Sequence, residues 1–440
     1  MSPSNRHGPH DLRPTTKILT EGFDPNLSVG SARPAVFRSS TYVFSSPEAA
    51  ERAFDVASGR AQAGEGESPD LIYARFNHPN AEILEDQIVN LERGASAALA
   101  FNSGMAAIMT SLLAFLRPGQ SVVYTAPIYG GTQHFVQDYL STWGVLSVSV
   151  PSGRGEQLVD AIRSAQNLGA VLIETPANPT LVMTDIRSVC EAVASLKSRT
   201  RESRPIVIVD NTLLGPAFQH PLSLGADLVV YSGTKYLSGF SDMLAGIVLA
   251  KDPDLVGEIR PLRNLFGNIL QPDECWMLSG RLPTVRLRMN RQSKNAQRIA
   301  ERLTSHPRIA RIFYPTLLTD PDQKRIFTDQ CDYPGAMFSL ELRGGKRAAF
   351  DFLRHLRIAR NAVSLGGVET LACHPKTTTH SGFTEEEFAQ NGITDGLVRV
   401  SVGIEDWRDL LDDFEQALAA VSPQRPHEAK EVPTYPSQGV

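Results

Sequence analysis

A carboxylate and an amine follow two short apolar segments of the sequence. Asp210 ends the segment 205–210 (PIVIVD), and Lys235 lies four residues after the segment 227–231 (DLVVY). Both segments are rich in β-branched residues, which predicts buried strands. Ligands bind beyond the carboxyl ends of strands in open parallel α/β sheets, so we expect both side chains at one sheet edge. A lysine there can form a Schiff base, and a carboxylate can bind a protonated ring nitrogen.

Other predicted strands are followed by groups that suit the same ligand. The sequence NSGM at 102–105 opens a predicted helix, whose free N–H groups can hold a phosphate. Tyr129 follows another strand and offers an aromatic ring to stack on. Each feature alone has an ordinary explanation: a lysine after a strand is usually a solvated loop residue, an aspartate at a strand end is usually a helix cap, and S-G-M is a common turn. Together they match pyridoxal 5'-phosphate, which needs a Schiff-base lysine, an acid at the ring nitrogen and a phosphate cradle.

Three other kinds of site have weaker support. Ser232 and Lys235 satisfy the S-x-x-K pattern of acyl transfer, but the segments 241–243 (SDM) and 376–378 (KTT) each miss the last residue of the companion motifs. No G-x-G-x-x-G opens a helix after a strand, and there is no Walker-type G-K-[ST], so nucleotide sites lack support. His374 and His380 are six residues apart, a poor spacing for metal ligands, and we interpret both as structural. No metal site is predicted.

The alternation of apolar and helical segments predicts an α/β fold. Continuous hydrophobicity within each strand indicates a mostly parallel sheet with both faces covered. A basic amphipathic helix over 284–303 then precedes a smaller α/β unit, which includes a strand at 337–342. We predict an N-terminal arm (1–75), a large domain (76–270), a C-terminal domain (271–421) and a disordered tail (422–440). The strands predicted for the large domain are 97–101, 121–124, 170–174, 205–210, 227–231 and 246–250.

The composition of the chain argues against nucleic-acid-binding and membrane proteins. The 440 residues carry 43 Lys and Arg against 48 Asp and Glu, a net charge of −5, so we expect neither nucleic acid nor a membrane surface as partner. The four cysteines are far apart, as in proteins of a reducing compartment, and we expect a cytoplasmic location. The uncharged segment 95–116 is long enough to cross a bilayer, but Asn102 and Ser103 near its middle favour a buried strand, turn and helix.

Many blocks of the chain resemble the Cys/Met-metabolism family of pyridoxal-phosphate enzymes, the transsulfuration enzymes. This family includes methionine γ-lyase, cystathionine γ-lyase, cystathionine γ-synthase and homoserine sulfhydrylases. The resemblance runs from about residue 34 to 406 and implies the aminotransferase-like fold, fold type I. The matching blocks are SSTYVF (39–44), YAR (73–75), NSGMAAI (102–108), YGGT (129–132), ETPANPT (174–180), VDNT (209–212), SGTKYLSGFSDMLAG (232–246), SLGGVETLACHP (364–375) and LVRVSVGIED (397–406).

The resemblance implies a role for individual residues. Lys235 would form the Schiff base, Asp210 with Thr212 would bind the ring nitrogen, and Tyr129 would stack on the ring and help to activate the substrate. Tyr73 and Arg75 would reach the phosphate of a neighbouring subunit, so we expect a homodimer at least and a tetramer, as a dimer of dimers. The phosphate would also be held by Gly104, Met105, Ser232 and Thr234, and the α-carboxylate of a small amino-acid substrate by Asn178, Ser364 and Arg399.

The sequence also departs from the family. Phe240 stands where many members have His, and Gly131 stands where methionine γ-lyases have Cys. Val363 stands where cystathionine enzymes usually have Glu. We therefore expect a γ-lyase that acts by α,γ-elimination on an L-amino acid with a sulfur- or oxygen-linked γ-substituent, such as methionine, cystathionine, homocysteine or canavanine. The alternatives are a γ-replacement transferase (cystathionine γ-synthase or O-acylhomoserine sulfhydrylase) and, more remotely, a non-catalytic binding protein with this fold.

Overall fold

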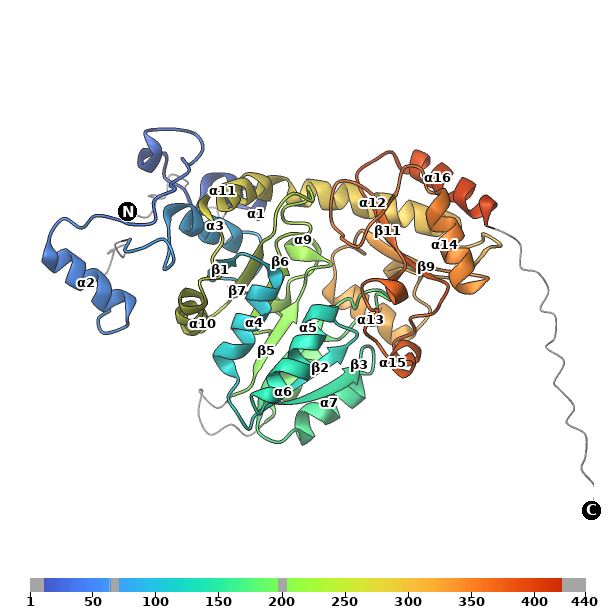
Figure 1. The fold of residues 1–440 in the computed structure, drawn as a ribbon, viewed down its shortest axis with the longest axis horizontal. Coiled ribbons are helices and arrows are strands. Elements are labelled where there is room, and N and C mark those ends of the chain that lie inside the picture. Colours follow the sequence, from blue (N-terminus) through green and yellow to red (C-terminus); the bar gives the residue numbers. More distant parts are fainter. Residues whose placement is uncertain (1–11, 63, 65–70, 197–203, 422–440) are drawn as a thin grey trace, which may run out of the picture.

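The computed structural model describes residues 12–62, 64, 71–196 and 204–421 (Figure 1). The tail predicted at 422–440 and most of the residues 63–70 lie outside this part of the chain. The described chain builds two sheets, which lie side by side in Figure 1. Helix α12 (Val285–Leu303) runs along the top of both, from the larger sheet toward the C-terminal unit.

The larger sheet has seven strands in the order β1-β7-β6-β5-β4-β2-β3. Strand β7 is antiparallel to both neighbours, and the other pairings are parallel. The carboxyl ends of β4, β5 and β6 therefore meet at one edge, as predicted. The strands are β1 (Ala97–Phe101), β2 (Ser121–Ala126), β3 (Leu146–Pro151), β4 (Leu168–Glu174), β5 (Ile206–Asp210), β6 (Leu228–Ser232) and β7 (Gly246–Ala250).

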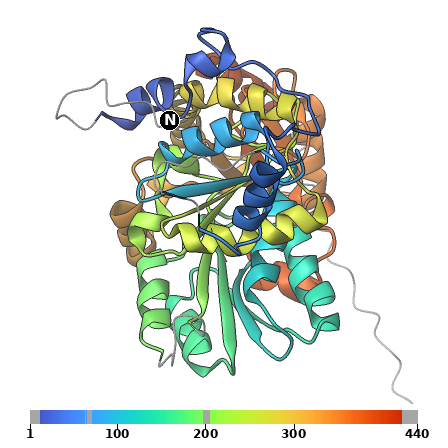
Figure 2. The same ribbon diagram turned by 90° about the vertical axis from the view of Figure 1, so that its left-hand side faces the viewer.

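Helices cover both faces of this sheet, which explains the continuous apolar segments (Figure 2). On β6, Val230 packs in a core with α4 (Gly104–Phe115) and α10 (Pro253–Phe266). The neighbouring Val229 packs on the opposite face with α3 (Pro79–Val89), α11 (Pro272–Arg281) and the start of α12. Toward β4, helices α7 (Gly155–Ser164) and α8 (Ile186–Ala194) cover that side.

The second sheet has five strands in the order β10-β11-β12-β9-β8. Its core is closed by α14 (Gly345–His355) and α16 (Trp407–Ala420). Helix α15 (Glu385–Gln390) belongs to this unit, whereas α13 (Pro321–Gln330) packs its Ile326 in the core of the large sheet. The strands are β8 (Ile309–Phe313), β9 (Met337–Leu342), β10 (Arg360–Asn361), β11 (Leu371–Cys373) and β12 (Leu397–Ser401).

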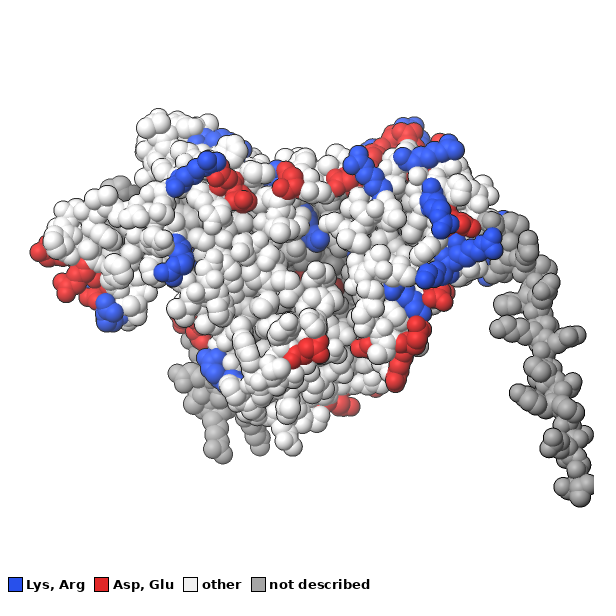
Figure 3. Space-filling view, viewed as in Figure 1, with Lys and Arg blue, Asp and Glu red and all other residues white. Residues whose placement is uncertain are grey.

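The N-terminal residues make few elements. Helix α1 (Pro14–Thr20) lies near α11, whereas α2 (Pro47–Ala57) projects away from both sheets in Figure 1. Short helices also occur at α5 (Gly130–His134), α6 (Leu140–Thr142) and α9 (Gly215–Phe218). On the face drawn in Figure 3, basic and acidic side chains are interspersed.

The structure agrees with the fold that the sequence predicts. All six predicted strands of the large sheet are present, and the predicted helix at 284–303 is α12. The uncharged segment 95–116 forms β1 and α4, and none of the helices in the described chain is both long and apolar enough for a membrane span. Residues Val285 and Met289 of α12 pack in the core of the large sheet, whereas Ala296 begins the second core. The predicted limits of the arm and domains stay a prediction.

Candidate active site

Asp210 is the last residue of β5 and is fixed by the residues that follow it. Its Oδ1 accepts hydrogen bonds from the Thr212 backbone N–H at 3.0 Å and from the Thr212 hydroxyl at 2.6 Å. The same hydroxyl oxygen accepts the N–H of Ser232, the last residue of β6, at 2.9 Å. Burial raises the pKa of Asp210 above its usual value. Asp210, Thr212 and Ser232 thus form one connected group at the sheet edge.

Lys235 lies in the turn after β6, with its amine directed toward the C-terminal unit. Its Nζ donates to Ser364 Oγ at 3.0 Å. Burial, followed by the positive charge of Arg399, lowers the pKa of this amine to about 8. A neutral amine is a nucleophile, so these surroundings favour covalent attachment to a carbonyl group.

Helix α12 holds the turn that carries Lys235. The guanidinium of Arg288 donates to the carbonyl oxygens of Tyr236 at 2.7 Å and Leu237 at 3.1 Å. Gly239 has a positive φ of 76°, and a Cβ there would lie 2.0 Å from Arg288 Nη1. Burial, followed by the charge of Arg281, lowers the pKa of Arg288 to about 10. The turn is therefore fixed by close packing around one buried guanidinium, a feature that the sequence analysis did not predict.

Gly104 and Met105 open helix α4 beside the end of β6. Ser103 caps the helix by accepting the Ala106 N–H at 3.1 Å, while the N–H groups of Gly104 and Met105 have no acceptor in the described part of the chain. A Cβ on Gly104 would lie 3.0 Å from Ser232 Cβ. These free N–H groups and the Ser232 hydroxyl fit an anionic phosphate. Thr234 lies on the next turn, where its Oγ1 accepts the Ala245 N–H at 3.0 Å.

Tyr129 stands at the mouth of a cavity of about 610 Å³. Lys235, Val363, Ser364 and His380 also line this cavity. The Tyr129 side chain is 49% exposed, so its ring is free to cover a bound ligand. A Cβ on Gly131 would lie 2.8 Å from Tyr129 Cε1, so the glycine leaves the room that this ring occupies.

Arg399 on β12 brings a positive charge to the same place from the second sheet. It is 2% exposed, and its Nη1 donates to Asn178 Oδ1 at 3.3 Å. Its Nη2 donates to the carbonyl oxygens of Val363 at 2.6 Å and Ser364 at 3.0 Å. Its Nε is buried and has no hydrogen-bond partner among the residues that the structure describes. A buried guanidinium with a free donor can bind a carboxylate, and the role of Arg399 in holding the substrate stays a prediction.

Tyr73 and Arg75 lie apart from this group. Arg75 Nη1 donates to the Asn264 carbonyl oxygen at 2.6 Å, and the guanidinium lies over the rings of Tyr73 and Phe76. Neither Tyr73 nor Arg75 lines the 610 Å³ cavity of its own chain. Their contribution to a neighbouring subunit stays a prediction.

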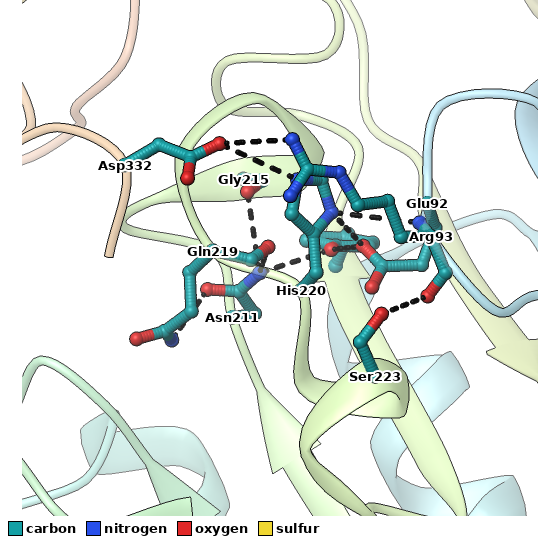
Figure 4. A network of polar contacts seen from close by, with 9 residues as sticks. Glu92, Arg93, Asn211, Gly215, Gln219, His220, Ser223 and Asp332 are labelled. Carbon is teal, nitrogen blue, oxygen red and sulfur yellow. Dashed lines mark hydrogen bonds and ion pairs between the residues drawn. The ribbon is translucent and has the colours of Figure 1, made fainter. Parts of the chain in front are cut away.

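A buried polar network is centred on Asn211, the residue that follows Asp210 in the chain (Figure 4). Asn211 Nδ2 donates to the carbonyl oxygens of Gly215 at 3.2 Å and Gln219 at 2.9 Å, and to the Tyr231 hydroxyl at 3.0 Å. Tyr231 in turn donates to Glu92 at 2.5 Å. The network fixes the chain after β5 and thereby the position of Asp210.

The two histidines that we interpreted as structural differ in position. His374 Nε2 lies 2.9 Å from the Asp395 carbonyl oxygen, away from the cavity. His380 lines the cavity, and burial, followed by the charge of Arg399, lowers its pKa to about 4. No group of three or more candidate metal ligands occurs among the residues that the structure describes. Glu174, the last residue of β4, is a member of the site that the sequence analysis missed, although its place at a strand end was the available signal.

Comparison with known proteins agrees with this geometry. The model of the family described as Cys/Met metabolism PLP-dependent enzyme matches residues 15–419. The chain is 39% identical to L-methionine gamma-lyase of Pseudomonas putida over 92% of this chain and 97% of that protein. It is 34% identical to cystathionine gamma-lyase of Bacillus subtilis over 92% and 99%. The crystal structure of cystathionine gamma synthase from Xanthomonas oryzae pv. oryzae in complex with cystathionine superposes with a TM-score of 0.83 at 33% identity, over 94% of this chain and 99% of that chain.

These matches cover nearly the whole chain and not just the cofactor motifs. They confirm the resemblance found in the sequence blocks and the aminotransferase-like fold. The chain belongs to the Cys/Met metabolism family of pyridoxal-phosphate-dependent enzymes, and its cofactor is pyridoxal 5'-phosphate.

Proposed function

We propose that the chain is a γ-lyase, which removes the γ-substituent of an L-amino acid by α,γ-elimination. The observation that carries the proposal is the Lys235 amine, buried beside Arg399 and 3.0 Å from Ser364 Oγ. An amine with a pKa of about 8 can both accept and release a proton near neutral pH. The names of the methionine and cystathionine gamma-lyase relatives support the same reaction type.

The residues of the chain divide into those that hold the cofactor and those that hold the substrate. Asp210 with Thr212 would bind the ring nitrogen, and Tyr129 would cover the ring. Gly104, Met105, Ser232 and Thr234 would bind the phosphate, with Tyr73 and Arg75 of a neighbouring subunit. Once bound, pyridoxal 5'-phosphate supplies an electron sink for the bonds at the substrate Cα.

The reaction then requires carboxylate binding and proton transfer. Arg399 would bind the substrate α-carboxylate, assisted by Asn178 and Ser364. The Lys235 amine would take the proton from Cα and then move protons at Cβ, which lets the γ-substituent leave with its bonding electrons. Addition of water would give a 2-oxo acid and ammonia. Val363 in the cavity wall carries no charge to bind a distal ammonium group, which favours a γ-lyase over a cystathionine γ-synthase.

The proposal has a spectroscopic test. Wild-type protein should be yellow, with a visible absorption band of the lysine-bound cofactor that borohydride removes. Lys235→Ala should lose covalent attachment and keep the fold by circular dichroism. If the wild-type protein shows no such band after reconstitution, the chain is a binding protein that shares the fold.

A substrate screen separates elimination from γ-replacement, which the similarity to a cystathionine gamma synthase structure also allows. Methionine, cystathionine, homocysteine, O-acetylhomoserine, O-succinylhomoserine and canavanine should each be tested with and without cysteine or sulfide. A γ-lyase releases a 2-oxo acid without an added thiol. Turnover only with a thiol would assign a transferase. We also propose a cytoplasmic homo-oligomer, at least a dimer.

A further inference from the structure

Glu174 is a second buried carboxyl group beside the cofactor acid. It ends β4, is 4% exposed, and stands directly opposite Asp210 in the register of β4 and β5. Buried carboxyl groups are retained where their oxygens are hydrogen-bonded. The question is therefore what the Glu174 oxygens bind.

Each oxygen of Glu174 accepts the backbone N–H of a residue assigned to the site. Oε2 accepts the Tyr129 N–H at 2.8 Å, and Oε1 accepts the Asn178 N–H at 3.3 Å. Tyr129 lies on the loop after β2, and Asn178 lies on the loop after β4. One carboxyl group thus links two loops at the strand that neighbours Asp210.

We propose that Glu174 is a positioning residue, which holds the ring of Tyr129 over the cofactor and the amide of Asn178 beside Arg399. This inference rests on the roles given to Tyr129 and Asn178 in the proposed function. Glu174 acts through these two residues, because its own contacts are to their backbone N–H groups.

The surroundings of Glu174 indicate that the length of its side chain, and not a negative charge, allows it to hold the two loops. Burial, followed by the negative charge of Asp210, raises the pKa of Glu174 to about 8. The charged form of Glu174 is therefore disfavoured, whereas both of its hydrogen bonds to backbone N–H groups depend on the length of the side chain. An uncharged side chain of the same length should therefore keep part of the function.

Three substitutions at Glu174 separate the length of the side chain from the presence of a carboxyl group. Glu174→Gln keeps the length but retains a single acceptor oxygen, which we expect to bind Tyr129, the closer N–H. Glu174→Asp keeps the carboxyl group but is one methylene shorter, and Glu174→Ala removes both acceptors. The matched control is Asp413→Ala on α16, because Asp413 is a buried carboxylate that accepts the backbone N–H groups of Arg357, Ile358 and Ala359 in the other unit.

Two ligand-binding measurements report the positions of the Tyr129 and Asn178 loops without requiring turnover. The visible circular dichroism of bound pyridoxal phosphate and its Kd report the Tyr129 loop. The Kd of glycine, measured from the change that glycine causes in the cofactor band, reports whether the Asn178 loop is correctly placed. This measurement does not depend on which leaving group the true substrate carries. Glycine is suitable because it has an α-carboxylate and no γ-substituent.

The expected results differ among the variants. Glu174→Ala and Glu174→Asp should weaken pyridoxal phosphate and glycine about tenfold each and reduce the visible dichroism. Glu174→Gln should keep the dichroism and weaken glycine alone. Asp413→Ala should lower the unfolding temperature and leave both Kd values unchanged. The inference is overturned if Glu174→Ala binds both ligands as wild type does, or if Glu174→Asp matches wild type while Glu174→Gln matches Glu174→Ala. A wild-type protein without a cofactor band would instead refute the proposed function itself.

Discussion

At the scale of single residues, burial determines the chemistry of the site. The guanidinium of Arg399 and the carboxyl groups of Asp210 and Glu174 are buried, and the amine of Lys235 is partly buried in the wall of the cavity. Burial disfavours the charged form of an ionisable group, and each neighbouring charge adds to or opposes that effect. Lys235 is pushed toward the neutral amine, because burial and the nearby Arg399 act in the same direction.

The lowered pKa of Lys235 predicts the pH dependence of cofactor attachment. The neutral amine is the attacking form, so the rate of attachment to the apoprotein should rise with pH and reach half its maximum near pH 8, not near the usual 10.5. The measurement is the initial rate of growth of the visible band at a series of pH values. A midpoint above pH 10 would contradict the buried position of this amine.

Arg399 predicts a second effect at this scale. Arg399→Lys replaces a planar group with five donors by a point charge, so substrate KM should rise about a hundredfold while the cofactor band remains. The pair of measurements is the KM of the substrate and the absorbance of the bound cofactor. Loss of the band together with activity would show that Arg399 acts on the fold and not on the substrate carboxylate.

At the scale of elements, α12 connects the two sheets through a row of polar side chains. Arg288 binds the turn after Lys235, and Gln292, one helical turn later, donates to the carbonyl oxygens of Gly367 and Val402. Asn295, on the next turn, donates to the carbonyl oxygens of Gly403 and Glu405. The helix therefore holds the lysine turn and the chain segments around Ser364 and Arg399 in one frame.

Arg288→Met should disturb this frame. It leaves two buried carbonyl oxygens without donors, and each such loss costs about 1–3 kcal/mol of unfolding free energy. We expect a lower unfolding midpoint in urea and a larger Kd for pyridoxal phosphate. Arg286→Met on the same helix is the control, since Arg286 is not fully buried, and it should change neither quantity. Equal effects of the two substitutions would refute the role of Arg288.

At the scale of the whole molecule, the position of Arg75 bears on assembly. The residue is bound to the Asn264 carbonyl oxygen and lies away from the cavity that holds Lys235. We expect Arg75 to complete the site of a neighbouring subunit. In a hybrid dimer, the Arg75→Ala subunit would then provide Lys235, and the Lys235→Ala subunit would provide Arg75 to that same site.

Mixing these two inactive variants should therefore restore activity. After subunit exchange, half of the dimers are hybrids with one intact site of two, so about a quarter of wild-type activity should return. The measurement is activity before and after exchange, with sedimentation to confirm the dimer. A fully active monomer, or no recovery in hybrids, would refute the shared site.

The sequence by itself was sufficient to predict the positions of the strands that are buried on both faces. Strands β1 and β7 have the predicted limits, because continuous apolar segments between turn residues signal strands that are covered on both faces. It also indicated Asp210 and Lys235, since each follows such a segment. The edge strand β3 (LSVSVP) was missed, because only one of its six residues is buried and the segment carries no continuous apolar signal. Strand β8, also partly exposed, was missed for the same reason.

The tertiary structure decided which distant residues meet. Lys235 contacts Ser364 across 129 residues, and Arg399 contacts Asn178 across 221. Glu174 faces Asp210 only because β4 and β5 pair in that register. Local hydrophobic periodicity reports which face of an element is buried, but pairing depends on the packing of whole sheets and helices. The roles of the strand-end residues Asp210 and Lys235 could therefore be predicted from the sequence. The supporting roles of Glu174 and Arg288 depend on tertiary contacts and could be identified only in the folded chain.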